Sequence, residues 1–272
     1  MNDYVHGFTE RERVRLHDQA GTLEDLMHHD TRYGPGQTVL EVACSVGATT
    51  VILARRSPEA RFTAIDLSAA SIATARRFIR DASGLDNAAF ARADLFRMPF
   101  PPESFDHVFV CFLLEHMTDP PGALASILNV LKPGGTATVI EGDHGSCYFH
   151  PHTAAARRAW NCLIDVQARL GANSLIGREL YPLLHGAGLS HVSVTPRMVY
   201  CDETRPDLMD GFVKKTIIPM VQGVHEQAIE WGLIDEGTWQ RGIADLHRTG
   251  TPPQGTFCYN FFKGVGVKES TG

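Results

Sequence analysis

The residues best suited to chemistry are acidic side chains that follow short apolar runs. In the run VLEVACSVGATT, Glu41 precedes a turn in which Ala43, Ser45 and Gly47 occupy every second position, and Asp66 follows about twenty residues later. A turn of small residues lets the backbone approach a ligand, and the helix after it directs its N-terminus at the ligand's polar end. This spacing is typical of a site for a nucleotide-like ligand, with Asp66 bound to ribose hydroxyls.

Alternating strands and helices are expected to position these residues. Strands are predicted at 38–43, 61–67, 88–94, 105–112 and 135–142, and helices at 49–56, 69–82 and 120–131. Continuously apolar strands that alternate with helices indicate a parallel sheet covered on both faces. The pattern then changes, with helices predicted at 152–170 and 176–187 and late strands at 189–200 and 255–267.

Two helical segments flank this unit. Thr9 and Glu12 form a capping-box pattern at the start of an amphipathic helix over 9–30. A mostly helical insert precedes the last strand, and its apolar residues are expected to form a cap: Phe212, Ile217, Ile218, Met220 and Trp231. We therefore predict an N-terminal lid helix at 1–34, a core at 35–200 and 250–272, and a cap at 201–249.

Composition narrows the class of protein. The 272 residues carry a formal charge of −6 and 43% hydrophobic residues, which disfavours nucleic acid and anionic membranes as partners. No apolar run reaches the ~20 residues of a membrane helix, and the charged N-terminus is unlike a signal peptide. Six scattered cysteines without a CxxC pair indicate reduced thiols. We expect a cytoplasmic protein without a metal site.

Several motifs in order resemble one family. Glu41 with its small-residue turn, Asp66, Asp94 in ARADLFRMPF, then SFDHVFVCFLLEHM and LKPGGTATVIEG together look like a class I S-adenosylmethionine-dependent methyltransferase, closest to the small-molecule, quinone-biosynthesis-like branch. The resemblance implies a doubly wound, mostly parallel, seven-stranded Rossmann-like sheet with an antiparallel last strand. It also implies S-adenosyl-L-methionine as cofactor and S-adenosyl-L-homocysteine as product.

The resemblance assigns cofactor contacts to individual residues. Glu41 would steady the turn and the cofactor's ammonium group. The further contacts implied are Ala43, Ser45 and Gly47 beside the methionine part, Asp66 on the ribose, Leu67 on the adenine, Asp94 and the Leu95 backbone at the adenine edge, the Cys111 carbonyl on the ammonium, Phe112 and His116 at the junction with the substrate, and Tyr4 and Gln19 from the lid.

Two of these positions depart from the family, because Ala43 and Ser45 stand where relatives have glycine. Ala43 would be a mild change if its φ is negative. The β-carbon of Ser45 could crowd the cofactor, and a position that needs positive φ would resist both residues.

A polar segment after the fifth strand, residues 141–152, is the expected place for catalysis, since it is predicted to leave the carboxyl end of the sheet as a loop. His144 or Tyr148 would orient or deprotonate the methyl acceptor, with Asp143 fixing the imidazole. Alternatively, these residues only hydrogen-bond the loop and cap the next helix. A metal site using His150 and His152 is a weaker reading, because no second cluster supports it.

The apolar cap favours a small, hydrophobic or aromatic methyl acceptor. One alternative is a non-catalytic ligand-binding or regulatory protein on a methyltransferase fold. A nicotinamide-dependent oxidoreductase would need the missing glycines. The sequence leaves open the acceptor, the methylated atom, and whether the chain forms a homodimer.

Overall fold

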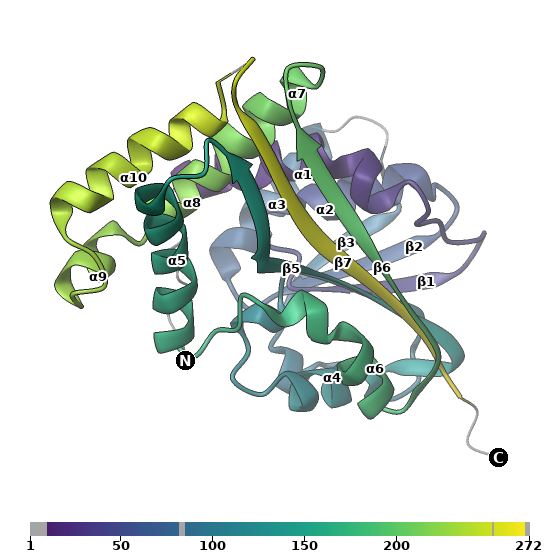
Figure 1. Cartoon of the computed structure of the whole chain (residues 1–272). Helices are drawn as coiled ribbons and strands as arrows, with labels where there is room; N and C mark the ends of the chain where they lie inside the picture. The colour runs from purple at the N-terminus through teal and green to yellow at the C-terminus, as the bar shows by residue number, and fades with distance from the viewer. Residues whose placement is uncertain (1–9, 82–84, 252, 270–272) are drawn as a thin grey trace. The chain divides into compact units, whose positions relative to one another are not determined.

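A seven-stranded sheet organises the protein, whose computed structural model describes residues 10–81, 85–251 and 253–269. The strands are β1 (Thr38–Val42), β2 (Arg61–Asp66), β3 (Ala88–Arg92), β4 (Phe105–Cys111), β5 (Leu131–His150), β6 (Leu189–Cys201) and β7 (Thr256–Lys268), in the order β3-β2-β1-β4-β5-β7-β6. β7 runs antiparallel to its neighbours (Figure 1). The predicted mostly parallel, doubly wound sheet with an antiparallel last strand is confirmed.

The helices fall close to their predicted places. They are α1 (Glu10–His28), α2 (Ala48–Arg56), α3 (Ala69–Asp81), α4 (Pro120–Asn129), α5 (Ala154–Arg169), α6 (Leu180–Gly186), α7 (Pro206–Leu208), α8 (Ile218–Gln222), α9 (His225–Glu230) and α10 (Glu236–Thr249), with a π-helix, η4, at Met209–Ile217 and short 3₁₀ turns η1 (Leu95–Arg97), η2 (Leu114–His116) and η3 (Ile176–Glu179). The helices from α7 to α10 form the predicted insert between the last two strands. The predicted cap residue Thr9 lies outside the described residues.

The chain divides into two compact units. One contains residues 27–141, 176–196 and 262–272, and the other contains 1–26, 142–175 and 197–261. β5, β6 and β7 each run through both units. The predicted division into lid, core and cap stays a prediction.

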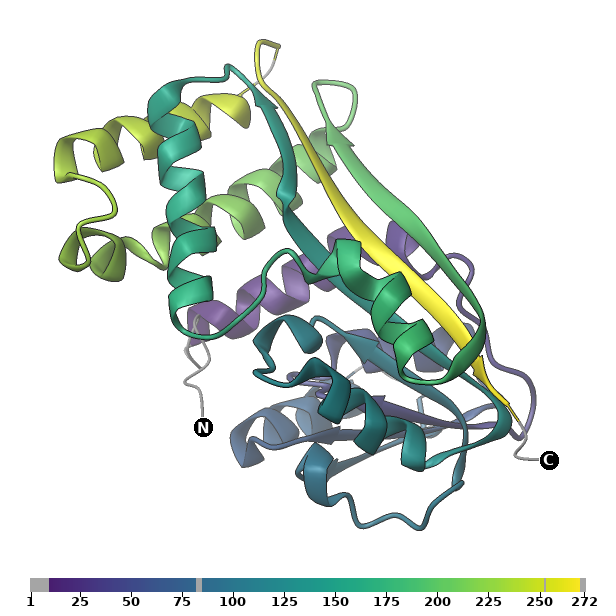
Figure 2. The ribbon, with the colours of Figure 1, turned by 60° about the horizontal axis from the view of Figure 1, so that its bottom comes forward.

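The unit that contains β1 to β4 has a parallel sheet as its centre. β1 pairs in parallel with β2 and β4, β2 with β3, and β4 with β5. Leu40, Val108 and Val110 are fully buried in this sheet, as expected for strands covered on both faces. α4 and α6 lie side by side against the sheet (Figure 2). All the strand ends predicted to bind the cofactor belong to this unit.

The other unit is built around α5 and α10, which cross closely (Figures 1 and 2). Gly242 permits this approach, since a β-carbon there would lie 2.5 Å from the Ala155 carbonyl oxygen. A buried aromatic cluster fills the unit's core and includes Trp160, Phe212 and Tyr259. The predicted cap residues Phe212, Ile217 and Ile218 are buried here.

The prediction of a loop after residue 141 was wrong, because β5 continues to His150. Cys147 and Phe149 are buried, whereas Tyr148 and His150 are exposed. This is the two-residue period of a half-buried strand. The polar composition of the segment, with two glycines, hid that period in the sequence.

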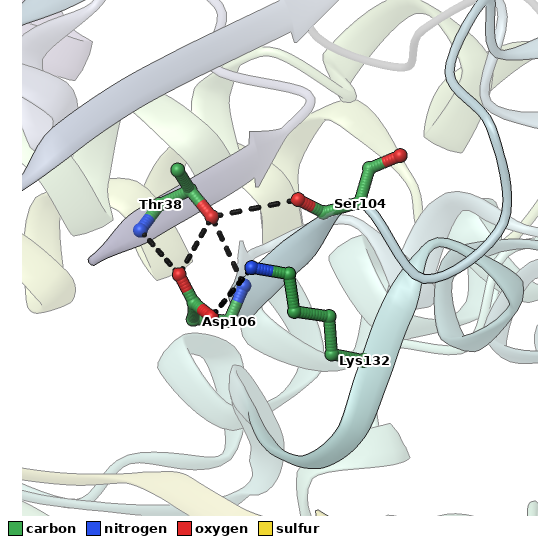
Figure 3. A network of polar contacts seen from close by, with 4 residues as sticks. All are labelled: Thr38, Ser104, Asp106 and Lys132. Carbon is green, nitrogen blue, oxygen red and sulfur yellow. Dashed lines mark hydrogen bonds and ion pairs between the residues drawn. The ribbon is translucent and has the colours of Figure 1, made fainter. Parts of the chain in front are cut away.

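A polar network ties together the amino-terminal ends of the central strands (Figure 3). Asp106 accepts hydrogen bonds from the Thr38 N–H and hydroxyl, both at 2.8 Å, and from the Lys132 ammonium at 2.7 Å. The Thr38 hydroxyl also lies 3.5 Å from the Ser104 carbonyl oxygen. The network fixes β1 against β4 and therefore the relative positions of the opposite, carboxyl ends of these strands.

Candidate cofactor site

The turn after β1 consists largely of residues in left-handed backbone conformations. Ala43, Ser45 and Gly47 have φ values of 61°, 47° and 78°. Gly47 also lacks room for a side chain, since a β-carbon would lie 2.9 Å from Ala75 Cβ and 3.1 Å from the Phe90 ring. The condition for a mild replacement at Ala43, a negative φ, is not met. Ala43 and Ser45 therefore hold backbone strain that glycine would avoid.

Asp66 fixes this turn directly from the end of β2. Its Oδ2 accepts the Ser45 N–H at 2.9 Å and its Oδ1 accepts the Ser68 N–H at 2.8 Å. Burial raises the pKa of Asp66, and the two N–H groups oppose that shift. A carboxylate has about four acceptor positions, so both oxygens can still accept hydrogen bonds from ligand hydroxyls.

Glu41 is a buried acid beside the turn, only 2% exposed. Burial raises its pKa to about 8, with the Thr50 hydroxyl lowering it and the Asp66 carboxylate raising it further. Its Oε2 has no hydrogen-bond partner among the described residues. A cationic ligand group would offset the cost of ionising the buried Glu41 carboxyl, and it would supply the hydrogen-bond partner that Oε2 lacks.

Large apolar side chains are exposed after the ends of β2 and β3. Leu67 and Phe96 are 48% and 53% exposed, although both are large apolar residues. Asp94 Oδ1 accepts the Phe96 N–H at 2.9 Å and caps the short helix η1, which begins at Leu95. Sequence reasoning missed Phe96, although an aromatic residue directly after Asp94-Leu95 was a usable signal.

The segment after β4 turns sharply. Cys111 ends the strand, and Phe112 has a φ of 55° and donates its N–H to the Ile140 carbonyl at 2.9 Å. His116 ends η2, with its Nε2 3.5 Å from Glu115 Oε1. The turn after β4 therefore places the Cys111 carbonyl, Phe112 and His116 at the carboxyl end of the sheet.

Glu141 supports that segment from β5, and the sequence did not single it out as a site residue. Its Oε1 accepts the N–H groups of Leu113 at 3.0 Å and Leu114 at 2.6 Å. Burial raises the pKa of Glu141, and the Glu115 carboxylate raises it further. The only signal in the sequence was an acid at the end of an apolar run, the same feature that marked Glu41 and Asp66.

The predicted catalytic residues lie in the other unit and differ in exposure. His144 is buried, and its Nδ1 lies 2.7 Å from the Tyr259 hydroxyl, while its carbonyl accepts the Trp160 indole N–H at 2.9 Å. Asp143 is buried and accepts the Gly145 N–H. Tyr148 is 66% exposed. Tyr259 was not predicted, because 115 residues separate it from His144.

The expected lid contacts are only partly described. Gln19 is buried in the same unit as His144 and accepts a hydrogen bond from Arg15 at 2.8 Å. Tyr4 lies outside the described residues. The roles of both residues stay predictions.

Neither a membrane-spanning helix nor a cluster of metal ligands occurs among the described residues. Within these ranges, no helix has both the length and the apolar character needed to span a membrane. In the same part of the chain, no group of three or more histidine, cysteine, aspartate or glutamate side chains is arranged to hold a metal ion.

The chain is similar to known methyltransferases. Residues 39–135 match the family model of a methyltransferase domain. The ubiquinone/menaquinone biosynthesis C-methyltransferase UbiE of Idiomarina loihiensis is 34% identical over 107 residues, which cover 39% of this chain and 43% of that protein. The chain spans 43% to 63% of the length of the curated relatives first matched.

Solved structures extend the similarity to nearly the whole chain. The [4+2]-cyclase SpnF has a TM-score of 0.56 at 20% identity, covering 93% of this chain and 81% of that chain. Geranyl diphosphate C-methyltransferase from Streptomyces coelicolor A3(2) has a TM-score of 0.54 at 16% identity, covering 92% and 79%. At these identities the likeness shows the fold.

The predicted resemblance is thereby confirmed. The protein has the class I methyltransferase fold, and residues 39–135 carry the match to a methyltransferase domain.

Proposed function

We propose that the chain is an S-adenosyl-L-methionine-dependent methyltransferase that acts on a small metabolite. The observation that carries this proposal is the hydrogen bond between Asp66 and the Ser45 N–H, which joins an acid at the end of β2 to the turn after β1. With Glu41 and Asp94 nearby in the fold, the unit offers acceptors for an ammonium group, two ribose hydroxyls and an adenine amino group.

The protein's part in the reaction is mainly positioning. The cofactor supplies a methyl group on a sulfonium, and its transfer to a neutral acceptor moves the positive charge rather than creating a new one. The gain from fixing donor and acceptor in a reactive geometry can reach about 7–11 kcal/mol. The hydrogen-bonded turn and its acids serve that purpose in this chain.

A small, hydrophobic or aromatic acceptor is supported by the apolar character of the insert. Phe212, Ile217 and Ile218 contribute buried apolar side chains to their unit. The similar proteins include a C-methyltransferase named for ubiquinone and menaquinone biosynthesis, which is consistent with a small-molecule acceptor.

His144 is the proposed base if the acceptor must lose a proton. The Tyr259 hydroxyl at Nδ1 restricts the imidazole to one orientation. In this role Nε2 is the nitrogen that takes the proton. His144→Ala should lower kcat while leaving the affinity for S-adenosylhomocysteine unchanged. Tyr148 is the alternative residue to orient or deprotonate the acceptor, and Asp143 is proposed to fix the imidazole of His144.

Calorimetry with S-adenosylhomocysteine tests the proposal. The wild-type chain should bind, and Asp66→Asn should weaken binding by roughly 2 kcal/mol, or about thirtyfold, because charge-assisted hydrogen bonds become neutral ones. Asparagine keeps the size of the side chain, which alanine would not. Asp86→Asn, at an exposed position of the same unit, should change nothing. Failure of the wild-type chain to bind millimolar ligand would remove the proposal.

The second candidate is a protein that binds a ligand on this fold without transferring a methyl group. The strained Ala43 and Ser45 motivate it, and the similarity to a [4+2]-cyclase shows that the fold also occurs outside methyl transfer. Labelled S-adenosylmethionine incubated with small-molecule extracts separates the two: label transfer supports the methyltransferase, and binding without transfer to any extract supports the alternative.

A further inference from the structure

Glu141 carries an unusual combination of burial and bonding. Its side chain is 0% exposed, and Oε1 alone accepts two backbone N–H groups, from Leu113 and Leu114. Its Oε2 is buried and has no hydrogen-bond partner among the described residues. A buried polar atom without a partner costs about 1–3 kcal/mol. Stability alone therefore does not explain an acid at this position.

The two N–H groups belong to the segment that turns away from the sheet after β4. Just before them, Phe112 has a left-handed φ of 55°, which is unfavourable for a bulky residue. Such strain persists only where the surroundings enforce it. The Glu141 carboxyl on one side and the Phe112 N–H to Ile140 carbonyl bond on the other supply that enforcement.

The same segment presents the residues that the cofactor site needs from β4. Cys111 lies immediately before the strained position, and η2 after it ends at His116. Burial raises the pKa of the Cys111 thiol, and the carboxylates of Glu141, Glu41 and Glu115 lie close enough to raise it further. The middle of β5, at Glu141, therefore meets the end of β4 where the cofactor's charged end is expected.

We infer that Glu141 is a positioning residue of the cofactor site, which holds the backbone of Leu113 and Leu114 so that Cys111, Phe112 and His116 face the cofactor. This role rests on the proposed function. Glu141 acts through the backbone of the turn and needs no contact with the cofactor itself.

The test compares three substitutions by two measurements. Glu141→Leu removes the acceptor, Glu141→Gln keeps an acceptor oxygen in the same place, and Glu141→Asp withdraws the carboxylate by about 1.5 Å, one carbon–carbon bond. Amide hydrogen exchange without ligand reports on Leu113 and Leu114, and calorimetry reports the affinity for S-adenosylhomocysteine. Glu59→Leu, at an exposed position, is the control.

We expect at least tenfold faster exchange at Leu113 and Leu114 and at least tenfold weaker binding in Glu141→Leu, with both effects largely reversed in Glu141→Gln. Exchange at Val108 and Val110 in the core of β4 should stay slow. If Glu141→Leu does not fold, Glu141→Asp should show the same two effects in smaller measure.

Three results would overturn the inference. Exchange that rises equally throughout β4 means that Glu141 only stabilises the unit. Faster exchange with unchanged affinity means that the turn does not serve the cofactor. Unchanged exchange means that Glu141 does not hold the turn. If the wild-type chain does not bind S-adenosylhomocysteine, the proposed function is overturned as well. Amide exchange at Leu113 and Leu114 would then still show whether Glu141 holds the turn.

Discussion

The strained turn after β1 makes a prediction that runs against the usual effect of glycine. Replacing Ala43 or Ser45 with glycine should stabilise the protein, because both residues have positive φ values, 61° and 47°. In most positions the same replacement is destabilising, since glycine gains more conformational freedom than any other residue when the chain unfolds.

The magnitude follows from two opposing terms. A non-glycine residue in the left-handed region costs about 1–2 kcal/mol. The greater entropy of glycine in the unfolded chain costs about 0.4–1 kcal/mol. Each substitution should therefore raise the free energy of unfolding by roughly 0.5–1 kcal/mol, or the melting temperature by about 1–4 °C.

The assay is urea and thermal unfolding followed by far-ultraviolet circular dichroism, for both single variants and the double variant. Ala73→Gly is the matched control, since Ala73 is exposed within α3 and glycine there should cost about 1 kcal/mol. Opposite signs for Ala43→Gly and Ala73→Gly would support the strain argument. If Ala43→Gly destabilises as much as Ala73→Gly, the turn is not strained and the reasoning fails.

Binding separates strain from crowding at Ser45. Relief of strain alone changes stability without changing the affinity for S-adenosylhomocysteine. If the Ser45 β-carbon also crowds the cofactor, Ser45→Gly should bind more tightly while Ala43→Gly does not.

Three further predictions concern other parts of the same unit. Gly47→Ala should lower the free energy of unfolding by about 2 kcal/mol or more and abolish binding of S-adenosylhomocysteine, because the new β-carbon would lie 2.9 Å from Ala75 Cβ and the residue would keep a positive φ. A melting curve like that of the wild type would contradict this prediction. Although burial opposes it, hydrogen bonds from Lys132 and Thr38 lower the pKa of Asp106 from 3.8 to about 2. The ionised carboxylate should therefore contribute roughly 1 kcal/mol to the free energy of unfolding above pH 4, and this contribution should be lost as the pH falls from about 4 to 2. In urea unfolding, Asp106→Asn should not show this pH dependence. Because burial raises the pKa of Glu41 to about 8, binding of a cationic ligand at pH 7 should release a proton from Glu41, and the affinity for that ligand should rise from pH 6 to pH 8. Calorimetry in buffers of different ionisation enthalpy measures the proton release, which Glu41→Gln should abolish.

The sequence predicted the parallel part of the fold well because its signals are local. Continuously apolar strands and the acids that follow them can be read within a few residues, and Glu41, Asp66 and Asp94 all lie at or directly after strand ends. The extension of β5 could not be read in this way. Its second half is polar and glycine-containing, and only partners distant in the chain make it a strand.

The site residues that sequence reasoning missed share a different property. Each hydrogen-bonds a residue that is distant in the sequence. Tyr259 is 115 residues from its partner His144, and Glu141 is 27 residues from Leu114. A pattern of spacing cannot indicate which strand end will face which backbone N–H, since that depends on strand order. Contacts of this kind follow only once the order β1-β4-β5-β7 is fixed.

The turn after β1 shows how far a departure from a family pattern can be interpreted. The sequence alone could state only a condition, that alanine is tolerated if φ is negative. The structure keeps the left-handed turn despite the side chains, because Asp66 holds the Ser45 N–H and Gly47 packs too closely against α3 and β3 to move. The surroundings therefore determine the backbone, and Ala43 and Ser45 adopt it at a cost. It follows that the shape of the turn does not depend on glycine at positions 43 and 45. Ala43→Gly and Ser45→Gly should therefore change stability more readily than cofactor binding.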